Sequence, residues 1–418
     1  MRAMKKAISL LLTLVLAAGS FALPTFAAED KIQVTEDISV SADYDWTRFK
    51  GQNVSLNVYN WGLYISDGSD ESVDVISAFE ELTGIKVNYT TFDTNESMYA
   101  KLKGGGANYD LIFPSDYMIG KMMNEGMLLP LNKENIPNLA NIGPEYLDKV
   151  YDPGNVYSVP YTWGTVGITY NKEMVDEADL AQSWELLWNP KYAGQILQFN
   201  ISRDCFAIAL KIMGRSMNPS STQDIEDALV KLQEQKPLVQ AYVMDEVFDK
   251  MEGGEAAIAP YFAGDGLTMT ADNPNLGMFI PPEGTIQYVD AMCIPASSQN
   301  PEAAEMFINY LCEVDVALQN ALFIQYTSPV SAVRELLPPE LAESELMYPD
   351  PEIIARSEYM TVLPDDVNSA MDMAWSELKS FDDQGNQWLV PVFLLVAIAM
   401  TVFNVWRRRA RKKRRQMY

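Results

Sequence analysis

The chain has 418 residues, of which 48% are hydrophobic, and its formal net charge at pH 7 is −26. It contains no histidine, which excludes Ser-His-Asp and Cys-His catalysis and the usual histidine-containing zinc sites. So acidic a chain repels nucleic acid and anionic lipid, and we expect no nucleic-acid partner.

The N-terminus has the pattern of a secretory signal peptide. Three basic residues precede an apolar run at 7–16, and Thr25-Phe26-Ala27 offers a cleavage site. We therefore expect residues 1–27 to be removed. No cysteine lies near this region, so a lipidated N-terminal cysteine cannot tether the mature protein.

Residues 54–113 have the pattern of a β-α-β-α-β unit. The predicted elements are a strand at 54–59, a helix at 75–82 ended by Gly84, a strand at 85–91, a helix at 96–103 ended by glycines 104–106, and a strand at 109–113. This succession favours a largely parallel sheet covered by helices, with ligand sites beyond the carboxyl ends of the strands. Trp61 and Ser115 follow two of these ends.

The middle of the chain predicts a second lobe. About 360 residues lie between the predicted signal peptide and the apolar stretch that begins at Trp388, enough for two hydrophobic cores. Segments 157–171 and 288–295 are rich in β-branched and aromatic residues and would carry the chain between the lobes and back. Residues 301–313 predict a core helix that begins at a proline. The cysteines at 205, 293 and 312 have apolar neighbours and are expected to be buried, unpaired thiols.

The C-terminus has the pattern of a membrane anchor. A 19-residue apolar stretch runs from Trp388 to Trp406, and eight basic residues follow it. We expect a transmembrane helix at 388–406 and a basic cytoplasmic tail at 407–418. A buried core helix would not explain the basic cluster. The acidic body would then lie outside a bacterial cell membrane, extracellular or periplasmic.

Six stretches occur in an order and spacing that identify a family. They are YNWGLYI (59–65), NESMYAKL (95–102), YDLIFPSDY (109–117), YSVPYTWG (157–164), FAGDG (262–266) and YVDAMCIP (288–295). Across nearly all of residues 52–380, the chain resembles the PotD/PotF-type polyamine-binding proteins of ABC transporters, the spermidine/putrescine class of solute-binding proteins.

The resemblance implies a fold and partners. The fold is α/β, a two-lobed periplasmic-binding-protein (type II) fold with a hinged ligand cleft, here followed by the transmembrane helix. The implied parts are lobe 1 at 52–162, lobe 2 at 163–289, and a return segment at 290–380, part of which rejoins lobe 1. The protein would be a monomeric receptor for putrescine or spermidine, not an enzyme, with no cofactor or metal, and would deliver its ligand to an ABC permease and its ATPase.

The resemblance also implies a site, whose chemistry suits a polyamine. Burying a methylene chain that carries ammonium groups requires aromatic walls and carboxylates. The implied residues are Trp61, Tyr64, Tyr117, Phe262 and Tyr288 as walls, Ser115 as a hydrogen-bonding group, and Asp204, Asp265 and Asp290 as partners of the ammonium groups.

The sequence supports the three aspartates unequally. Asp290 lies in an apolar run, where an unpaired carboxylate would be costly, which favours a functional partner. Asp265 lies between two glycines and suits a solvated turn equally well. Asp204 follows Ser202 at a predicted helix start and could equally be a cap or a first-turn residue.

Two positions depart from the family pattern. Leu63 and Ile201 stand where relatives commonly carry acids, so two contacts to ammonium groups are missing. Either Asp67 or Asp116 substitutes for them, or the ligand is shorter, since putrescine has fewer ammonium groups than spermidine.

Three other functions remain open from the sequence. They are a solute receptor for ferric iron, thiamine or a sugar, an extracellular hydrolase with a carboxylate pair, and a membrane-tethered sensor or adhesion module without a transport role. Neighbouring genes for a permease and an ATPase would separate transport from the last two.

Overall fold

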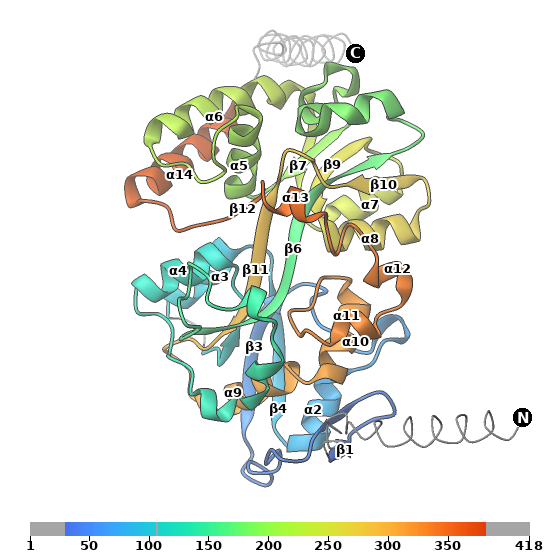
Figure 1. The fold of residues 1–418 in the computed structure, drawn as a ribbon. Coiled ribbons are helices and arrows are strands. Elements are labelled where there is room, and N and C mark those ends of the chain that lie inside the picture. The colour runs from blue at the N-terminus through green and yellow to red at the C-terminus, as the bar shows by residue number, and fades with distance from the viewer. Residues whose placement is uncertain (1–29, 106–107, 382–418) are drawn as a thin grey trace, which may run out of the picture.

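The computed structural model describes residues 30–105 and 108–381 and has two lobes joined by long strands (Figure 1). The predicted signal peptide (1–27), transmembrane helix (388–406) and basic tail (407–418) lie outside these residues. Among the described helices, none alone is long and apolar enough to cross a membrane, although α9 (Pro301–Leu311) and α10 (Val314–Ile324), bent by 75°, pass together on length and composition.

The first lobe begins with the predicted β-α-β-α-β unit. Its elements are β3 (Ser55–Trp61), α2 (Val75–Thr83), β4 (Lys86–Phe92), α3 (Asn95–Lys103), β5 (Leu111–Ile112) and α4 (Asp116–Asn124). Strand β3 pairs in parallel with β4 and β5. Gly84 ends α2 with a φ of 75°, a left-handed conformation that glycine adopts without steric cost. The predicted strand at 109–113 is shorter, since only two of its residues pair.

Two long strands connect the lobes. β6 (Ser158–Asn171) and β11 (Ile286–Cys293) pair antiparallel from Gln287↔Thr165 to Cys293↔Ser158 and run from one lobe into the other (Figure 1). The parallel pairing predicted from residues 54–113 is confirmed for β3, β4 and β5. The sheet as a whole is mixed, because a chain that crosses to a second lobe and returns forms an antiparallel pair. Segments 157–171 and 288–295 do carry the chain across and back, as predicted.

In the second lobe the sheet continues from β6 with mixed pairing and has helices on both sides (Figure 1). Its elements are β7 (Ile196–Phe199), α5 (Ser202–Ile212), α6 (Thr222–Gln235), β8 (Val239–Val243), α7 (Glu246–Glu252), β9 (Ile258–Phe262), α8 (Ala263–Asp272) and β10 (Leu276–Phe279). β7 pairs in parallel with β8 and β9, whereas β9 and β10 pair antiparallel with β6.

After β11 the chain visits both lobes again. The buried helix α9 confirms the predicted core helix, and α10 packs on α2 of the first lobe. The remaining elements are α11 (Val333–Leu336), α12 (Pro339–Ala342), α13 (Pro351–Ile354), β12 (Glu358–Tyr359) and α14 (Asp365–Ser380), the last packed on α5 and α6. The chain thus passes between the lobes a third time, and we call residues 357–362 the third crossing segment.

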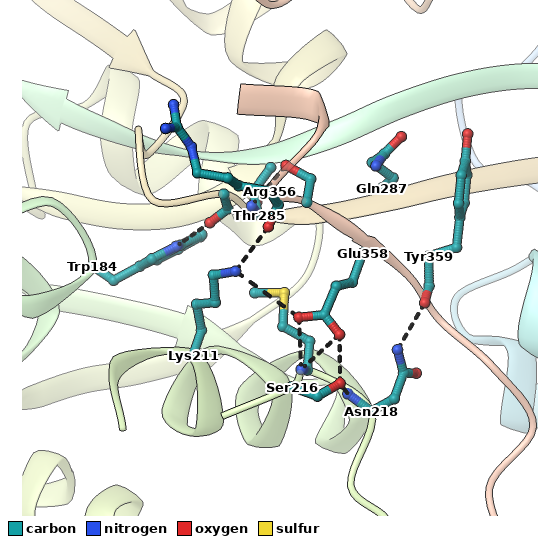
Figure 2. A network of polar contacts seen from close by, with 12 residues as sticks. Trp184, Lys211, Ser216, Asn218, Thr285, Gln287, Arg356, Glu358 and Tyr359 are labelled. Carbon is teal, nitrogen blue, oxygen red and sulfur yellow. Dashed lines mark hydrogen bonds and ion pairs between the residues drawn. The ribbon is translucent and has the colours of Figure 1, made fainter. Parts of the chain in front are cut away.

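The third crossing segment is fixed to the second lobe by polar contacts (Figure 2). Glu358 accepts hydrogen bonds from the Ser216 hydroxyl and the Met217 N–H, and the Asn218 amide donates to the Tyr359 carbonyl at 2.9 Å. β12 also pairs in parallel with the start of β11.

The N-terminal hairpin packs on the first lobe. β1 (Lys31–Gln33) and β2 (Ser39–Ser41) form a two-stranded sheet that docks through hydrogen bonds from Ser39 to Asp315 of α10. The three cysteines are buried and unpaired, as predicted.

Candidate functional site

A cavity opens between the two lobes. It contains about 960 Å³ not filled by atoms, partly open to solvent, of which about 100 Å³ admits the centre of a water molecule. All nine residues predicted for the site line it: Trp61, Tyr64, Ser115, Tyr117, Asp204, Phe262, Asp265, Tyr288 and Asp290. That these residues contact a ligand stays a prediction.

The ends of strands bring most of these residues together. Trp61 is the last residue of β3 and Phe262 the last of β9, while Ser115 lies between β5 and α4. Asp204 and Asp265 lie in the first turns of the helices that follow β7 and β9. In open α/β sheets the carboxyl ends of strands form the ligand crevice, which is why residues so distant in sequence meet here.

Asp290 lies at the centre of the cavity wall, on β11. Its side chain is only 5% exposed, and its two oxygens accept hydrogen bonds from the hydroxyls of Ser115 and Tyr64, each at 2.6 Å. The pairing of β11 with β6 shifts between Asp290 and Ala291, an irregularity of the kind that re-aims a side chain. Burial raises the pKa of Asp290 to about 6 against the opposing effect of the two hydroxyls.

The Ser115 hydroxyl contacts Asp290 instead of capping its own helix. It is the N-cap residue of α4, yet its hydroxyl makes no capping bond, because it donates to Asp290 and accepts from the Asn95 amide at 3.0 Å. The Asn95 carbonyl oxygen in turn accepts from the Ser115 N–H at 3.1 Å. A capping residue diverted from its helix indicates a functional constraint.

The second lobe contributes two further carboxyl groups. Burial raises the pKa of Asp204 to about 7, with Glu96 and Asp290 adding to the rise and Arg203 opposing it. Burial also raises the pKa of Asp265 to about 7, although the Tyr326 hydroxyl donates to this carboxylate at 2.9 Å. Asp204 is a first-turn residue of α5 that also lines the cavity, and its role as partner of an ammonium group stays a prediction. Asp265 lies on a helix rather than in a solvated turn.

Aromatic rings surround these carboxyl groups. The Trp61 indole N–H donates to the Phe113 carbonyl at 2.8 Å, which fixes the ring at the cavity wall. The rings of Phe262 and Tyr288 meet edge to face with centroids 5.3 Å apart. Faces of this kind attract cations and cover methylene groups.

Two of the aromatic residues predicted for the cavity wall also donate hydrogen bonds to carboxyl groups. Tyr64 donates to Asp290, and the Tyr117 hydroxyl donates to Glu96 at 2.9 Å. Glu96 lines the cavity and is exposed as a residue. Loss of water around its carboxyl group nevertheless raises the pKa of Glu96. These tyrosines therefore order carboxyl groups as well as lining the cavity.

Sequence reasoning missed Tyr326 and Glu96. Tyr326 follows α10, and its ring packs against Tyr64 and Tyr288 at centroid distances of 5.1 Å and 6.2 Å. A Cβ on Gly264 would lie 2.2 Å from this ring, so a glycine is needed where Tyr326 approaches Asp265. No local pattern marks Tyr326. Glu96 lies within one of the family stretches and could have been found there.

The two departures from the family pattern both line the cavity. Leu63 is 71% exposed with a φ of 50°, and Ile201 is 8% exposed. Of the two acids considered as substitutes, Asp116 lines the cavity and Asp67 does not.

A cleft between two α/β lobes, joined by crossing strands and lined from both sides, defines a two-lobed solute-binding protein of the periplasmic type. Residues 74–349 match the family described as "Bacterial extracellular solute-binding protein". The spermidine/putrescine-binding periplasmic protein of Escherichia coli (strain K12) is 38% identical over 309 residues, which cover 73% of this chain and 86% of the relative. The chain belongs to this solute-binding family.

Two further comparisons agree. The putrescine-binding periplasmic protein PotF of Escherichia coli (strain K12) is 29% identical over 347 residues, covering 78% of this chain and 91% of PotF. The crystal structure of the spermidine/putrescine ABC transporter substrate-binding protein PotD from Streptococcus pneumoniae is 38% identical, with a TM-score of 0.67 and coverage of 78% of this chain and 99% of PotD. The resemblance to PotD/PotF-type proteins is thereby confirmed.

Proposed function

We propose that this protein is the receptor of an ABC importer for a polyamine, putrescine or spermidine, which it binds between its lobes and delivers to a permease and its ATPase. The observation that carries the proposal is Asp290. A buried carboxylate with both oxygens oriented by hydroxyls, inside a cleft lined with aromatic rings, is suited to pair with an ammonium group.

The cavity suggests how such a ligand would be held. An ammonium group would pair with Asp290, and others would pair with Asp204 or Asp265 of the second lobe. The methylene groups would lie between Trp61 and the edge-to-face pair of Phe262 and Tyr288. Leu63 and Ile201 offer no charge, which favours a ligand with fewer ammonium groups.

Closure of the lobes would couple binding to transport. A ligand drives closure only if it binds the closed state more tightly than the open one, so residues of both lobes must touch it. Ser115 from the first lobe and Asp204 from the second meet this requirement. We take lobe 1 as 52–162, lobe 2 as 163–289 and the return segment as 290–380, all in one monomeric chain.

We further propose that the receptor is tethered. The apolar stretch at 388–406 and the basic residues behind it support an anchor with a cytoplasmic tail, and residues 1–27 support export of the body. A tether would keep the receptor at a high local concentration near its permease. Without a transporter, the same architecture would serve a membrane-tethered sensor.

A thermal-shift screen of the purified full chain tests the ligand class. Putrescine or spermidine at 100 times its Kd should stabilise the protein by about 2.7 kcal/mol, and ferric citrate, thiamine and maltose should not. Stabilisation by one of the latter three, with none from either polyamine, would reassign the receptor to that solute.

Replacing Tyr326 with phenylalanine should weaken polyamine binding about tenfold, because the Asp265 carboxylate loses the hydroxyl that donates to it. The ring and its packing would remain. Calorimetric titration measures the change, and Tyr348→Phe is the control, since the Tyr348 hydroxyl has no hydrogen-bond partner and lies outside the cavity. Equal affinity in wild type and Tyr326→Phe would show that this hydroxyl does not matter for binding.

A further inference from the structure

A buried cation beside the cavity lacks partners for two of its nitrogens. Arg203, on α5 of the second lobe, is 3% exposed. Its Nη2 donates to the Asn218 side chain at 2.7 Å and to the Thr361 carbonyl at 3.2 Å, whereas Nε and Nη1 are buried without a hydrogen-bond partner. Among the described residues, no carboxylate lies within salt-bridge distance of Arg203. Such groups are costly to leave unpaired.

A complementary group lies on the other lobe. Asp116, the first residue of α4, is 0% exposed, and its Oδ1 accepts from the Tyr117 N–H at 2.7 Å, but its Oδ2 has no hydrogen-bond partner. Burial raises the pKa of Asp116, Asp290 adds to the rise, and the Arg203 cation opposes it together with backbone N–H groups. Arg203 contacts Thr361, and α4, which begins at Asp116, packs on the next residue, Val362, so both groups belong to elements that meet the third crossing segment.

The other acids near Arg203 are less suitable. Asp204 is its neighbour on the same helix, and Glu96 already accepts from the Tyr117 hydroxyl. Among the described acids of the first lobe, Asp116 is the one with a buried oxygen that has no hydrogen-bond partner.

We propose that Arg203 is a positioning residue whose free Nε and Nη1 pair with Asp116 Oδ2 when the lobes close on a ligand. This interlobe ion pair stabilises the closed state without touching the ligand. It also reserves Asp116 for Arg203, so Asp116 does not replace the acids missing at Leu63 and Ile201. Asp204, Asp265 and Asp290 then remain as the ligand's carboxylates.

The third crossing segment links this pair to the hinge. The Asn218 oxygen that accepts from Arg203 also accepts from the Thr361 N–H at 2.9 Å, and Figure 2 shows Asn218 donating to the Tyr359 carbonyl. On the first-lobe side, a Cβ on Gly120 of α4 would lie 2.6 Å from Val362, so the same segment packs tightly against the helix that carries Asp116. The third crossing segment therefore contacts both Arg203 and the helix that carries Asp116, and we expect movement of the lobes about this segment to change how the two groups face each other.

A double-mutant cycle on the full chain tests the pair. Arg203→Met, Asp116→Asn and the double variant are titrated with putrescine and spermidine, and ligand dissociation is followed by tryptophan fluorescence. Each single variant should lose about tenfold in affinity, mainly through faster dissociation, and the double variant should be at most about threefold weaker than the weaker single variant. Arg203→Lys should recover part of the loss.

Controls separate the pair from a general loss of structure. Arg215→Met removes an arginine that pairs with Asp224 and Asp227 away from the cavity, and should leave dissociation unchanged. Should Arg203→Met fail to fold, Arg203→Lys replaces it in the cycle. Additive losses for Arg203 and Asp116, or singles with wild-type dissociation, would overturn the proposal.

This inference rests on the proposed function, and different results would contradict the function and the ion pair. If the wild type binds neither polyamine, the function is wrong, and the same cycle is run with the solute that stabilises the wild type in the thermal-shift screen. Coupling between Arg203 and Asp116 in that cycle would then support the pair, and additivity would overturn it.

Discussion

Replacing Asp290 with asparagine should lower the affinity for putrescine or spermidine about 100-fold or more while the fold persists. Asparagine keeps the size of the side chain and still accepts a hydrogen bond, but it leaves a buried ammonium group without its counter-charge. Calorimetric titration measures the affinity, and circular dichroism measures the fold.

Asp110→Asn is the matched control for this substitution. Asp110 is 1% exposed and accepts several hydrogen bonds, including one from Ser298 at 2.8 Å, but it precedes β5 at the end away from the cavity and does not line it. Its substitution should cost stability without changing affinity. Tight polyamine binding by Asp290→Asn would mean that the ligand lies elsewhere.

Acid should weaken ligand binding strongly. Carboxyl groups must be ionised to pair with ammonium, and the pKa values of Asp204 and Asp265 are about 7 while that of Asp290 is about 6. Lowering the pH from about 7.5 to about 5.5 should therefore reduce affinity about 100-fold, and binding near neutral pH should release protons. Titrations in buffers with different ionisation enthalpies measure the proton release. Affinity that does not change over this range would contradict the assignment of these carboxylates.

Stability of the ligand-free protein should respond to these groups in the opposite direction. Their pKa values are higher in the folded state than in the unfolded chain, so their contribution to stability is full below about pH 4 and is lost as the pH rises through about 6 to 7. Denaturant unfolding of wild type and Asp204→Asn across this range isolates one of the groups, because the variant should lose less stability on the way to neutral pH.

The sequence predicted which residues line the cavity better than it predicted the pairing of the sheet. Trp61 and Ser115 could be placed because local alternation locates the strand ends, and the family stretches carry six of the other seven residues. Asp204 lies outside those stretches, at a predicted helix start. The antiparallel pairing of β6 with β11 could not be read from periodicity, which records the faces of a strand but not its neighbour. The sequence predicts a strand over 109–113, but only the two residues of β5 pair with neighbouring strands, and periodicity does not record that pairing either.

Groups that act across the two lobes were the hardest to predict. Tyr326 reaches Asp265 from a loop 61 residues further along the chain. Arg203 could not be singled out from the sequence, because its proposed role depends on two buried nitrogens that lack hydrogen-bond partners among the described residues of the folded protein. Tyr64 and Tyr117 were expected only to line the cavity with their rings, but the hydroxyl of each also donates a hydrogen bond to a carboxyl group.

The most direct test of the central claim is calorimetric titration of the full chain in detergent, after refolding to remove carried-over ligand, with putrescine, cadaverine, spermidine and spermine in turn. We predict saturable binding of putrescine or spermidine with one site per chain. No heat from any of the four, on protein shown to be folded, would contradict the account and indicate that Leu63 and Ile201 have redirected the cleft to a different solute.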